Sequence, residues 1–319
     1  VVLMIDPCIN PDGRDRYANF HRMTGNLIPD VDATTREHRE PWPGGRTNHY
    51  YHDLNRDWVW QSQQESQQRL KLYNQWLPHI HVDYHEQSYN DPYYFAPAVE
   101  PYHELITPWQ REFQKNIGNN NAKYFDERQL LYFTNEDFDL LYPGYGDTYP
   151  MYKGAIGMTY EKAGSGAGGV AVITSDTDTL TLKERLNHHY WTGLATVETT
   201  YNSSEKVIQE FQDYFNKANS EPTGNYKNFI ISNLQNHEHK KNDLIDLLDV
   251  NGIDYYYPLF PEKKLKNVYN YKTGLLEDRV INSGDIVIPA KQDFSVLTQI
   301  LFEPKTYLSD SLTYDITAW

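Results

Sequence analysis

Two short apolar segments, each followed by a polar side chain, constrain the fold of this chain more than any other feature. Residues 80–84 alternate between apolar and polar side chains and lead into His85, and the mostly apolar residues 155–160 lead into Glu161. Both have the length of a strand, and residues 108–123 between them have the pattern of a helix. Open α/β sheets present their chemistry at the ends of strands. The chain is therefore predicted to be an α/β protein with a mixed, mostly parallel sheet and flanking helices.

The first fifty residues give a different signal. Residues 1–5 are continuously apolar, which is typical of a strand buried on both faces. Residues 14–52 show no regular period and contain three Pro and a Gly-Gly pair, so a long loop is predicted there. Because natural proteins rarely begin within a buried strand, we expect that further sequence precedes residue 1.

Two domains are expected within the 319 residues. Helices predicted over residues 57–76 and 179–201 complete a first domain, residues 1–202. Residues 203–225, with a charged helix at about 205–217, are predicted to form a helix and linker. Residues 226–319 are predicted to form a second, smaller α/β domain of the flavodoxin-like kind, with βαβ units and short connections. Its predicted strands are residues 228–232, 253–257 and 285–289, and its predicted helices are residues 240–250, capped by Gly252, and 293–302.

Composition excludes several classes of partner. The formal net charge is −15, whereas nucleic-acid binding requires clustered Lys and Arg, so nucleic acid is not expected as a partner. No run of 18 apolar residues occurs, so no membrane span is predicted. Cys8 is the single cysteine, which rules out an intrachain disulfide.

Four short motifs follow one another along the chain. They are residues 10–13 (Asn-Pro-Asp-Gly), 53–57 (Asp-Leu-Asn-Arg-Asp), 83–86 (Asp-Tyr-His-Glu) and 160–164 (Tyr-Glu-Lys-Ala-Gly). In this order they resemble the zinc carboxypeptidase family, the exopeptidases of the carboxypeptidase A and B kind. The resemblance covers about residues 1–200 and implies a carboxypeptidase-like domain that is incomplete at its N-terminus. It also implies a secreted or periplasmic protein.

The resemblance implies zinc as the cofactor and His85 as the third of its three protein ligands. The family's first metal motif, His-x-x-Glu, should precede Asn10, yet none of the 12 His lies in such a motif. We therefore expect the motif to lie before residue 1, and the isolated chain to be inactive and to bind no stoichiometric zinc. His81 is not expected to share a metal with His85, because four residues along a strand span about 13 Å. It is predicted to lie in the core or behind the ligand.

The resemblance assigns the base and the substrate-binding pair. Glu161 matches the family's catalytic glutamate, which activates a metal-bound water and later passes a proton to the leaving amine. Asn55 and Arg56 match the pair that grips the substrate's terminal carboxylate, a role that suits a planar guanidinium. The structural alternative is that Asp53 or Asp57 holds Arg56 in an ion pair.

Two further roles stay open between neighbouring residues. The resemblance places an oxyanion-stabilising arginine after the Asn-Pro-Asp-Gly motif. Arg16 is favoured, with Arg22 close behind and Arg14 also eligible. It places a mobile tyrosine that contacts substrate roughly twenty residues before Glu161. Tyr142 is favoured, and Tyr145 and Tyr149 compete with it.

The function predicted from this resemblance is a metallocarboxypeptidase-type hydrolase, with a peptide bearing a free C-terminal carboxylate as its partner. Two alternatives stay open: a zinc amidase or deacylase that acts on small amides or cell-wall peptides, and a non-catalytic peptide- or glycan-binding protein on the same scaffold. Residues 226–319 loosely resemble the glutamine amidotransferase-like domains of some large bacterial carboxypeptidases. Because this region has no Cys, it cannot supply a cysteine nucleophile, which favours a structural or binding role.

Overall fold

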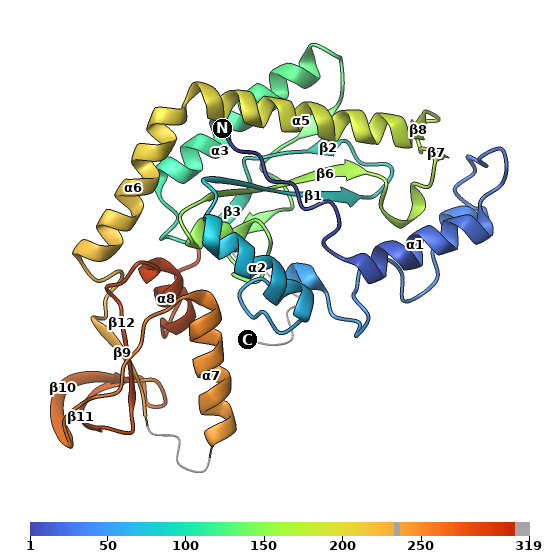
Figure 1. Ribbon diagram of the computed structural model, residues 1–319. Coiled ribbons are helices and arrows are strands. Elements are labelled where there is room, and N and C mark those ends of the chain that lie inside the picture. Colours follow the sequence, from blue (N-terminus) through green and yellow to red (C-terminus); the bar gives the residue numbers. More distant parts are fainter. Residues whose placement is uncertain (233–236, 310–319) are drawn as a thin grey trace. The chain divides into compact units, whose positions relative to one another are not determined.

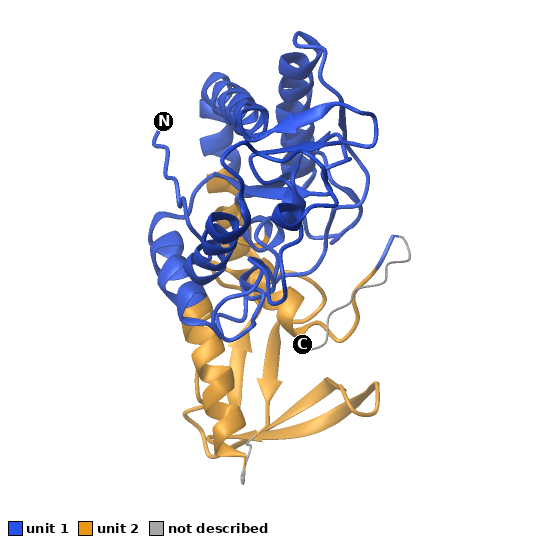
Figure 2. Ribbon diagram, turned by 90° about the vertical axis from the view of Figure 1, so that its right-hand side faces the viewer, with its two compact units in different colours: residues 1–151, 155–210, 308–319 blue, residues 152–154, 211–307 orange. Residues whose placement is uncertain are grey.

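The computed structural model describes residues 1–232 and 237–309. They form two compact units, which Figure 2 colours separately. Unit 1 contains residues 1–151 and 155–210, with 308–309 from the end of the described chain, and unit 2 contains residues 152–154 and 211–307. The division falls within helix α6 (Ser204–Ser220).

A four-stranded sheet organises unit 1 (Figure 1). Its strands lie in the order β1 (Ile80–Gln87), β6 (Ile156–Ala163), β2 (Tyr93–Tyr94) and β4 (Tyr132–Phe133). β1 pairs with β6 in parallel, β6 with β2 antiparallel, and β2 with β4 in parallel. The predicted mixed, mostly parallel sheet is therefore confirmed. Both long strands run two residues past His85 and Glu161, which face one another in register.

Helices cover both faces of this sheet. α3 (Pro108–Asp126) and α5 (Leu182–Asn202) lie along each other and pack on β6 (Figure 1). The core between these helices and the sheet is largely aromatic, and its Tyr93, Phe113 and Phe125 are fully buried. α2 (Gln64–Trp76) packs on the other face, where the ring of Tyr73 lies 5.7 Å from that of His81.

Local hydrogen bonds set where these helices begin. α3 and α5 each open with a capping box, formed by Thr107 with Gln110 and by Thr181 with Glu184. The helix predicted from residue 57 begins only at Gln64, because Asp57 accepts hydrogen bonds from the main-chain amides of Ser62 and Gln63 and folds the chain into a turn.

The start of the chain differs most from the prediction. Residues 1–5 are exposed and form no strand, because no described strand pairs with them. The predicted loop over residues 14–52 contains most of α1 (Pro11–Thr24), which Asn10 caps by accepting from the Gly13 amide at 3.0 Å. Pro11 suits the first position of a helix, where no amide proton is needed.

The remaining elements of unit 1 are short. The strands are β3 (Val99–Tyr102), β5 (Asp139–Leu140), β7 (Ala171–Ile173) and β8 (Thr179–Thr181), and the helix is α4 (Thr148–Tyr152). The 3-10 turns are η1 (Arg36–His38), η2 (Leu54–Arg56) and η3 (Ser165–Ala167). Within the ranges described, no helix has the length and apolar character that crossing a membrane requires.

Unit 2 differs from the predicted βαβ arrangement. β9 (Asn228–Ile231) pairs with β12 (Ile286–Pro289) antiparallel, and residues 253–257 form only a bridge between Tyr256 and Val287. A hairpin of β10 (Glu262–Asn270) and β11 (Leu275–Asn282) was not anticipated, because its exposed, charged strands show little apolar alternation. The helices α7 (Glu238–Asn251), which Gly252 caps in the left-handed conformation, and α8 (Ser295–Phe302) follow the prediction.

Candidate active site

His85 and Asp83 form the centre of the candidate site. They lie two residues apart on β1 and so share one face of the strand. Asp83 is buried, and its Oδ2 lies 2.7 Å from His85 Nε2. Burial lowers the pKa of His85, but the charge and hydrogen bond of Asp83, with a smaller contribution from Glu161, outweigh it and raise that pKa to about 9. At neutral pH the pair is therefore an imidazolium with a carboxylate.

Asn55 reaches this pair from η2. Its Nδ2 lies 3.0 Å from His85 Nε2, and its Oδ1 accepts from the Gly146 amide at 2.7 Å. One ring nitrogen cannot both donate to Asp83 and accept from Asn55. The shorter contact and the carboxylate charge assign the proton to Nε2, so Asn55 is a packed neighbour there. A side chain at Gly146 would lie 2.3 Å from Asp83 Oδ2, so only glycine permits this approach.

Glu161 faces His85 from the neighbouring strand. It is only 8% exposed, and its Oε2 is buried without a hydrogen-bond partner in the structure as described. Burial raises its pKa to about 7, although the positive charge of His85 opposes the shift. A buried carboxyl oxygen without a hydrogen bond destabilises the fold. Such groups are common at functional sites, where a ligand or reacting group supplies the missing hydrogen bond.

Arg46 is a charged neighbour that the sequence patterns did not single out. Its positive charge lowers the pKa values of His85, Asp83 and Glu161. The side chain is half-exposed, and its Nε donates to Asp53 Oδ2 at 3.0 Å. The one available signal was its place seven residues before the Asp-Leu-Asn-Arg segment.

Arg56 lies beside the pair but is partly engaged with its own segment. Its Nη1 donates to Asn55 O at 3.1 Å and lies 3.8 Å from Asp53 Oδ2. The guanidinium also lies over the ring of Tyr145, 4.5 Å from its centroid. A loose ion pair with Asp53 therefore exists, whereas Asp57 serves the turn before α2.

The candidate tyrosines have different surroundings. Tyr142 is buried, and its hydroxyl accepts from Trp60 Nε1 at 2.7 Å and donates to Arg56 O at 3.4 Å. Tyr149 is also fully buried. The ring of Tyr145 contacts the guanidinium of Arg56.

The candidate oxyanion arginines lie on α1. Arg16 donates through Nη2 to the carbonyl of Thr47 and, at 3.2 Å, to that of Asn48. Arg14 pairs with its neighbour Asp15, and Arg22 is exposed. In the part of the chain described, none of these three arginines contacts Glu161 or His85.

The described residues around His85 do not form a complete set of metal ligands. Residues 1–232 and 237–309 contain no group of three or more His, Cys, Asp or Glu that could hold a metal ion. His81 packs by its ring edge against Trp58 and Tyr73, with centroids 5.1 and 5.7 Å away, in agreement with its predicted place in the core. Among the described residues His85 therefore lacks the further ligands that a zinc site requires.

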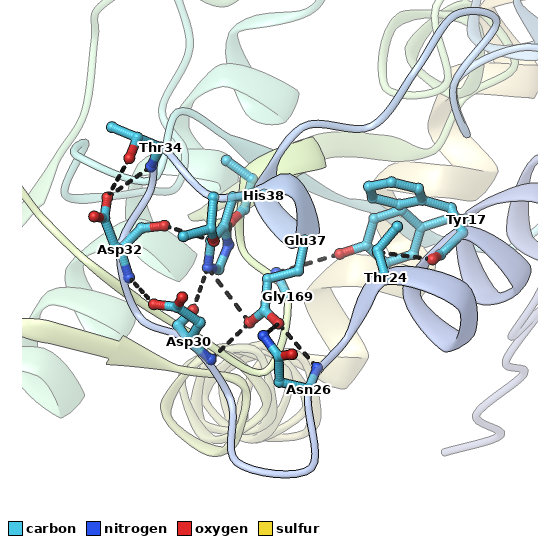
Figure 3. Close-up of polar contacts among 12 residues, drawn as sticks. Tyr17, Thr24, Asn26, Asp30, Asp32, Thr34, Glu37, His38 and Gly169 are labelled. Atoms are coloured by element: carbon cyan, nitrogen blue, oxygen red, sulfur yellow. Dashed lines mark hydrogen bonds and ion pairs between the residues drawn. The ribbon is translucent and has the colours of Figure 1, made fainter.

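The glycine-rich loop after Glu161 is tied to the segment that follows α1 (Figure 3). His38 is buried, and its Nδ1 and Nε2 lie 2.7 Å from Ala167 O and 2.6 Å from Asp30 O. The Gly169 amide donates to the Tyr17 hydroxyl at 3.2 Å. These contacts hold the second half of the loop, at Ala167 and Gly169.

Comparison with known proteins finds no match by sequence and a distant likeness by structure. No family model matches the chain, and no curated protein matches it. Among solved structures it is similar to a metallo-carboxypeptidase from Burkholderia cenocepacia, with 13% identity and a TM-score of 0.36. The likeness covers 59% of this chain and 44% of that one, so the chain spans under half the length of that protein. A likeness at this level does not place the chain in a family.

Proposed function

We propose that this chain contains the acid–base and substrate-facing part of a metallocarboxypeptidase-type hydrolase, acting on peptides with a free C-terminal carboxylate. One observation supports it above the others. Asn55, His85 and Glu161, far apart in the sequence, meet at one edge of the sheet, with Asn55 Nδ2 3.0 Å from His85 Nε2 and Glu161 in register with His85.

Glu161 is the proposed general base. A carboxyl group whose pKa is about 7 can accept a proton from water near neutral pH and return it. The water's oxygen adds to the carbonyl carbon of the terminal amide, its proton passes to Glu161, and the C–N bond breaks as the amine takes that proton. Arg46 is the proposed cation for the oxyanion, in place of Arg16, because its charge acts on Glu161. Arg56 supplies the guanidinium for the substrate's carboxylate.

Zinc is the proposed cofactor, and the described residues fit it only in part. A bound zinc would replace the Nδ1 proton of the His85 imidazolium while Asp83 holds the proton on Nε2, an arrangement of carboxylate and imidazole that is common at zinc sites. The other two ligands would come from outside the described residues. A bound zinc lowers the pKa of its water and polarises a carbonyl.

The test is release of the C-terminal residue from N-acyl dipeptides by the natural protein in which this sequence occurs. We expect Glu161→Gln to lower kcat by about 10²–10⁴-fold, the usual contribution of a positioned base. Arg56→Met should raise KM for free-acid peptides and not for the same peptides amidated at the C-terminus. Arg39→Met, at an exposed position, is the matched control.

Unchanged turnover in Glu161→Gln would refute the proposed base. Equal cleavage of acid and amide peptides would instead favour an amidase. Saturable peptide binding without turnover would favour the non-catalytic alternative.

A further inference from the structure

A cavity of about 590 Å³ lies at the start of α2, and its walls come from the segments on either side of η2. Its volume is within the usual range of small-molecule sites and equals that of roughly twenty water molecules. No Asp, Glu, Lys or Arg lines it. Besides one tyrosine, one histidine and one serine, the lining consists of four glutamines, Gln63, Gln64, Gln67 and Gln68. The cavity is therefore polar but carries no fixed charge.

A buried polar network holds the two walls together. Asn48 is fully buried, and its Oδ1 accepts from the main-chain amides of Tyr50 and His52, both at 3.0 Å. Its Nδ2 donates to Gln63 Oε1 at 2.9 Å, which joins one wall to the other. The Gln63 amide in turn donates to Asp57 Oδ2 at 2.9 Å. The main chain of both walls is thus fixed by the fold itself, and a site formed in advance binds at a smaller cost in entropy.

The glutamine side chains offer both kinds of hydrogen-bonding group. A primary amide has two N–H donors and one carbonyl acceptor. Gln67 uses one donor, since its Nε2 donates to Gln61 O at 2.8 Å. Gln64 and Gln68 are exposed, and their side chains make no hydrogen bond to the residues that the structure describes. The cavity can therefore donate to a neutral ligand and accept from it at several points.

Tyr50 adds an exposed aromatic ring to this lining. The residue is 73% exposed, and its ring packs edge-on against that of His49, with centroids 5.1 Å apart. The next residue, Tyr51, stacks on Trp42 at 5.2 Å, and both of these residues are also exposed. Exposed apolar groups that gather beside polar side chains are typical of ligand-binding surfaces.

These features together favour a neutral carbohydrate. A sugar ring carries hydroxyl groups around its edge, each a donor and an acceptor, and C–H groups on its faces. The glutamine amides match the hydroxyl groups, and the ring of Tyr50 matches a C–H face. An anion is disfavoured, because no cation lines the cavity and the carboxylate of Asp57 bonds its wall at Gln63.

A peptide is the main alternative ligand. Proteins recognise peptides at the edge of a sheet, in an apolar groove or at a cluster of basic side chains. The lining contains no strand residue, no aliphatic side chain and neither Lys nor Arg. It therefore matches none of these modes.

We propose that this cavity binds a neutral oligosaccharide, with one sugar ring packed on Tyr50 and hydroxyl groups paired with the amides of Gln64 and Gln68. Neither His85 nor Glu161 lines the cavity, so the proposal does not depend on the peptidase activity.

The test uses the full chain of 319 residues and four neutral disaccharides: cellobiose, maltose, lactose and N,N′-diacetylchitobiose. Isothermal titration calorimetry is expected to show saturable one-to-one binding of at least one of them. Tyr50→Ala removes the ring and should weaken that binding at least tenfold. Tyr201→Ala, which removes an exposed tyrosine from α5, is the matched control and should leave the affinity unchanged.

A second pair of variants keeps the inference open to refutation if Tyr50→Ala fails to fold, which circular dichroism would show. Gln68→Met keeps the length of the side chain and removes its amide, and it should weaken binding about 3–10-fold, the usual effect of one neutral hydrogen bond. Gln75→Met, at an exposed position of α2 outside the cavity, should have no effect.

Three results would each overturn the proposal. The first is that none of the four sugars binds saturably at millimolar concentrations. The second is full affinity for the sugar in a folded Tyr50→Ala or Gln68→Met protein. The third is that N-acetyl-trialanine amide, a neutral peptide, binds more tightly than the sugars and loses that affinity in Tyr50→Ala.

Discussion

The sharpest prediction concerns His81, which has no polar partner in the described structure. Its Nε2 is buried without a hydrogen bond between the rings of Trp58 and Tyr73. Burial lowers its pKa from 6.5 to about 4. Between these two pH values the unfolded chain binds a proton at His81 that the folded chain does not bind. The free energy of unfolding therefore decreases as the pH falls from about 6.5 toward 4. Above that window the group contributes no pH dependence.

The loss of unfolding free energy can be calculated from the change in the pKa of His81. A pKa of 6.5 in the unfolded chain and about 4 in the folded one gives a limiting loss of about 3 kcal/mol and a loss of about 2 kcal/mol between pH 7 and pH 5. His81→Phe keeps the ring packing and removes the titration. We expect the variant to unfold with the same or slightly higher free energy at pH 7, because a buried unpaired polar atom costs about 1–3 kcal/mol.

The assay is urea unfolding followed by tryptophan fluorescence at pH 7 and pH 5. Each Trp that the structure describes lies in unit 1, so the signal reports the unit that contains His81. The quantity to compare is the change in unfolding free energy between the two pH values, which should be about 2 kcal/mol smaller in His81→Phe than in the wild type. His49→Phe, at an exposed position, should match the wild type. Equal pH dependence in His81→Phe and the wild type would refute the reasoning.

Two other predictions test the metal site and the packing. Calorimetric titration of residues 1–319 with zinc should show no tight one-to-one binding, because the described residues contain no group of three or more His, Cys, Asp or Glu that could hold a metal ion, and stoichiometric binding would contradict this. Gly157→Ala should lower the unfolding free energy by roughly 1–3 kcal/mol or more, since its methyl group would lie 1.8 Å from Asp147 O. Gly166→Ala, whose methyl group would meet only the flexible side chain of Glu40 at 3.3 Å, should cost much less. Equal destabilisation of the two variants would show that this close approach does not limit the fold.

Several strands and helices could be predicted from the sequence, because they bury one face or all of their side chains and so show a regular apolar pattern. The strands around His85 and Glu161 and the helix α3 appear within a few residues of their predicted bounds. α2 was predicted to begin too early, because the side chain of Asp57 takes the amides that a helix would have used. Such a turn forms because one carboxylate accepts hydrogen bonds from three donors, and the pattern of apolar residues does not indicate it.

The strand predicted over residues 1–5 shows the converse error. An apolar run indicates burial, but a strand also needs a neighbour to pair with, and pairing is a long-range property. The hairpin β10–β11 was missed for a different reason, since its strands pair with each other locally, are mostly exposed and show little apolar alternation.

Parts of the candidate site could be predicted because its residues lie in distinctive local strings. Asn55, His85 and Glu161 come together as the motifs implied. Arg46 could not be found in that way. It stands outside these strings, and its relevance appears only when its charge is placed among Asp83, His85 and Glu161.

The buried charges on the two faces of β1 and β6 differ in what surrounds them. On one face Glu161 keeps a buried oxygen without a hydrogen-bond partner among the described residues. On the other face the carboxylates of Glu184 and Glu86 raise the pKa of buried Lys162 against the effect of burial. Packing alone would not retain the carboxyl of Glu161, since an apolar residue of similar volume is often at least as stable in such a place. Glu161 is therefore a buried charge that folding does not require, and a reacting group beside it is the simplest physical reason for its presence.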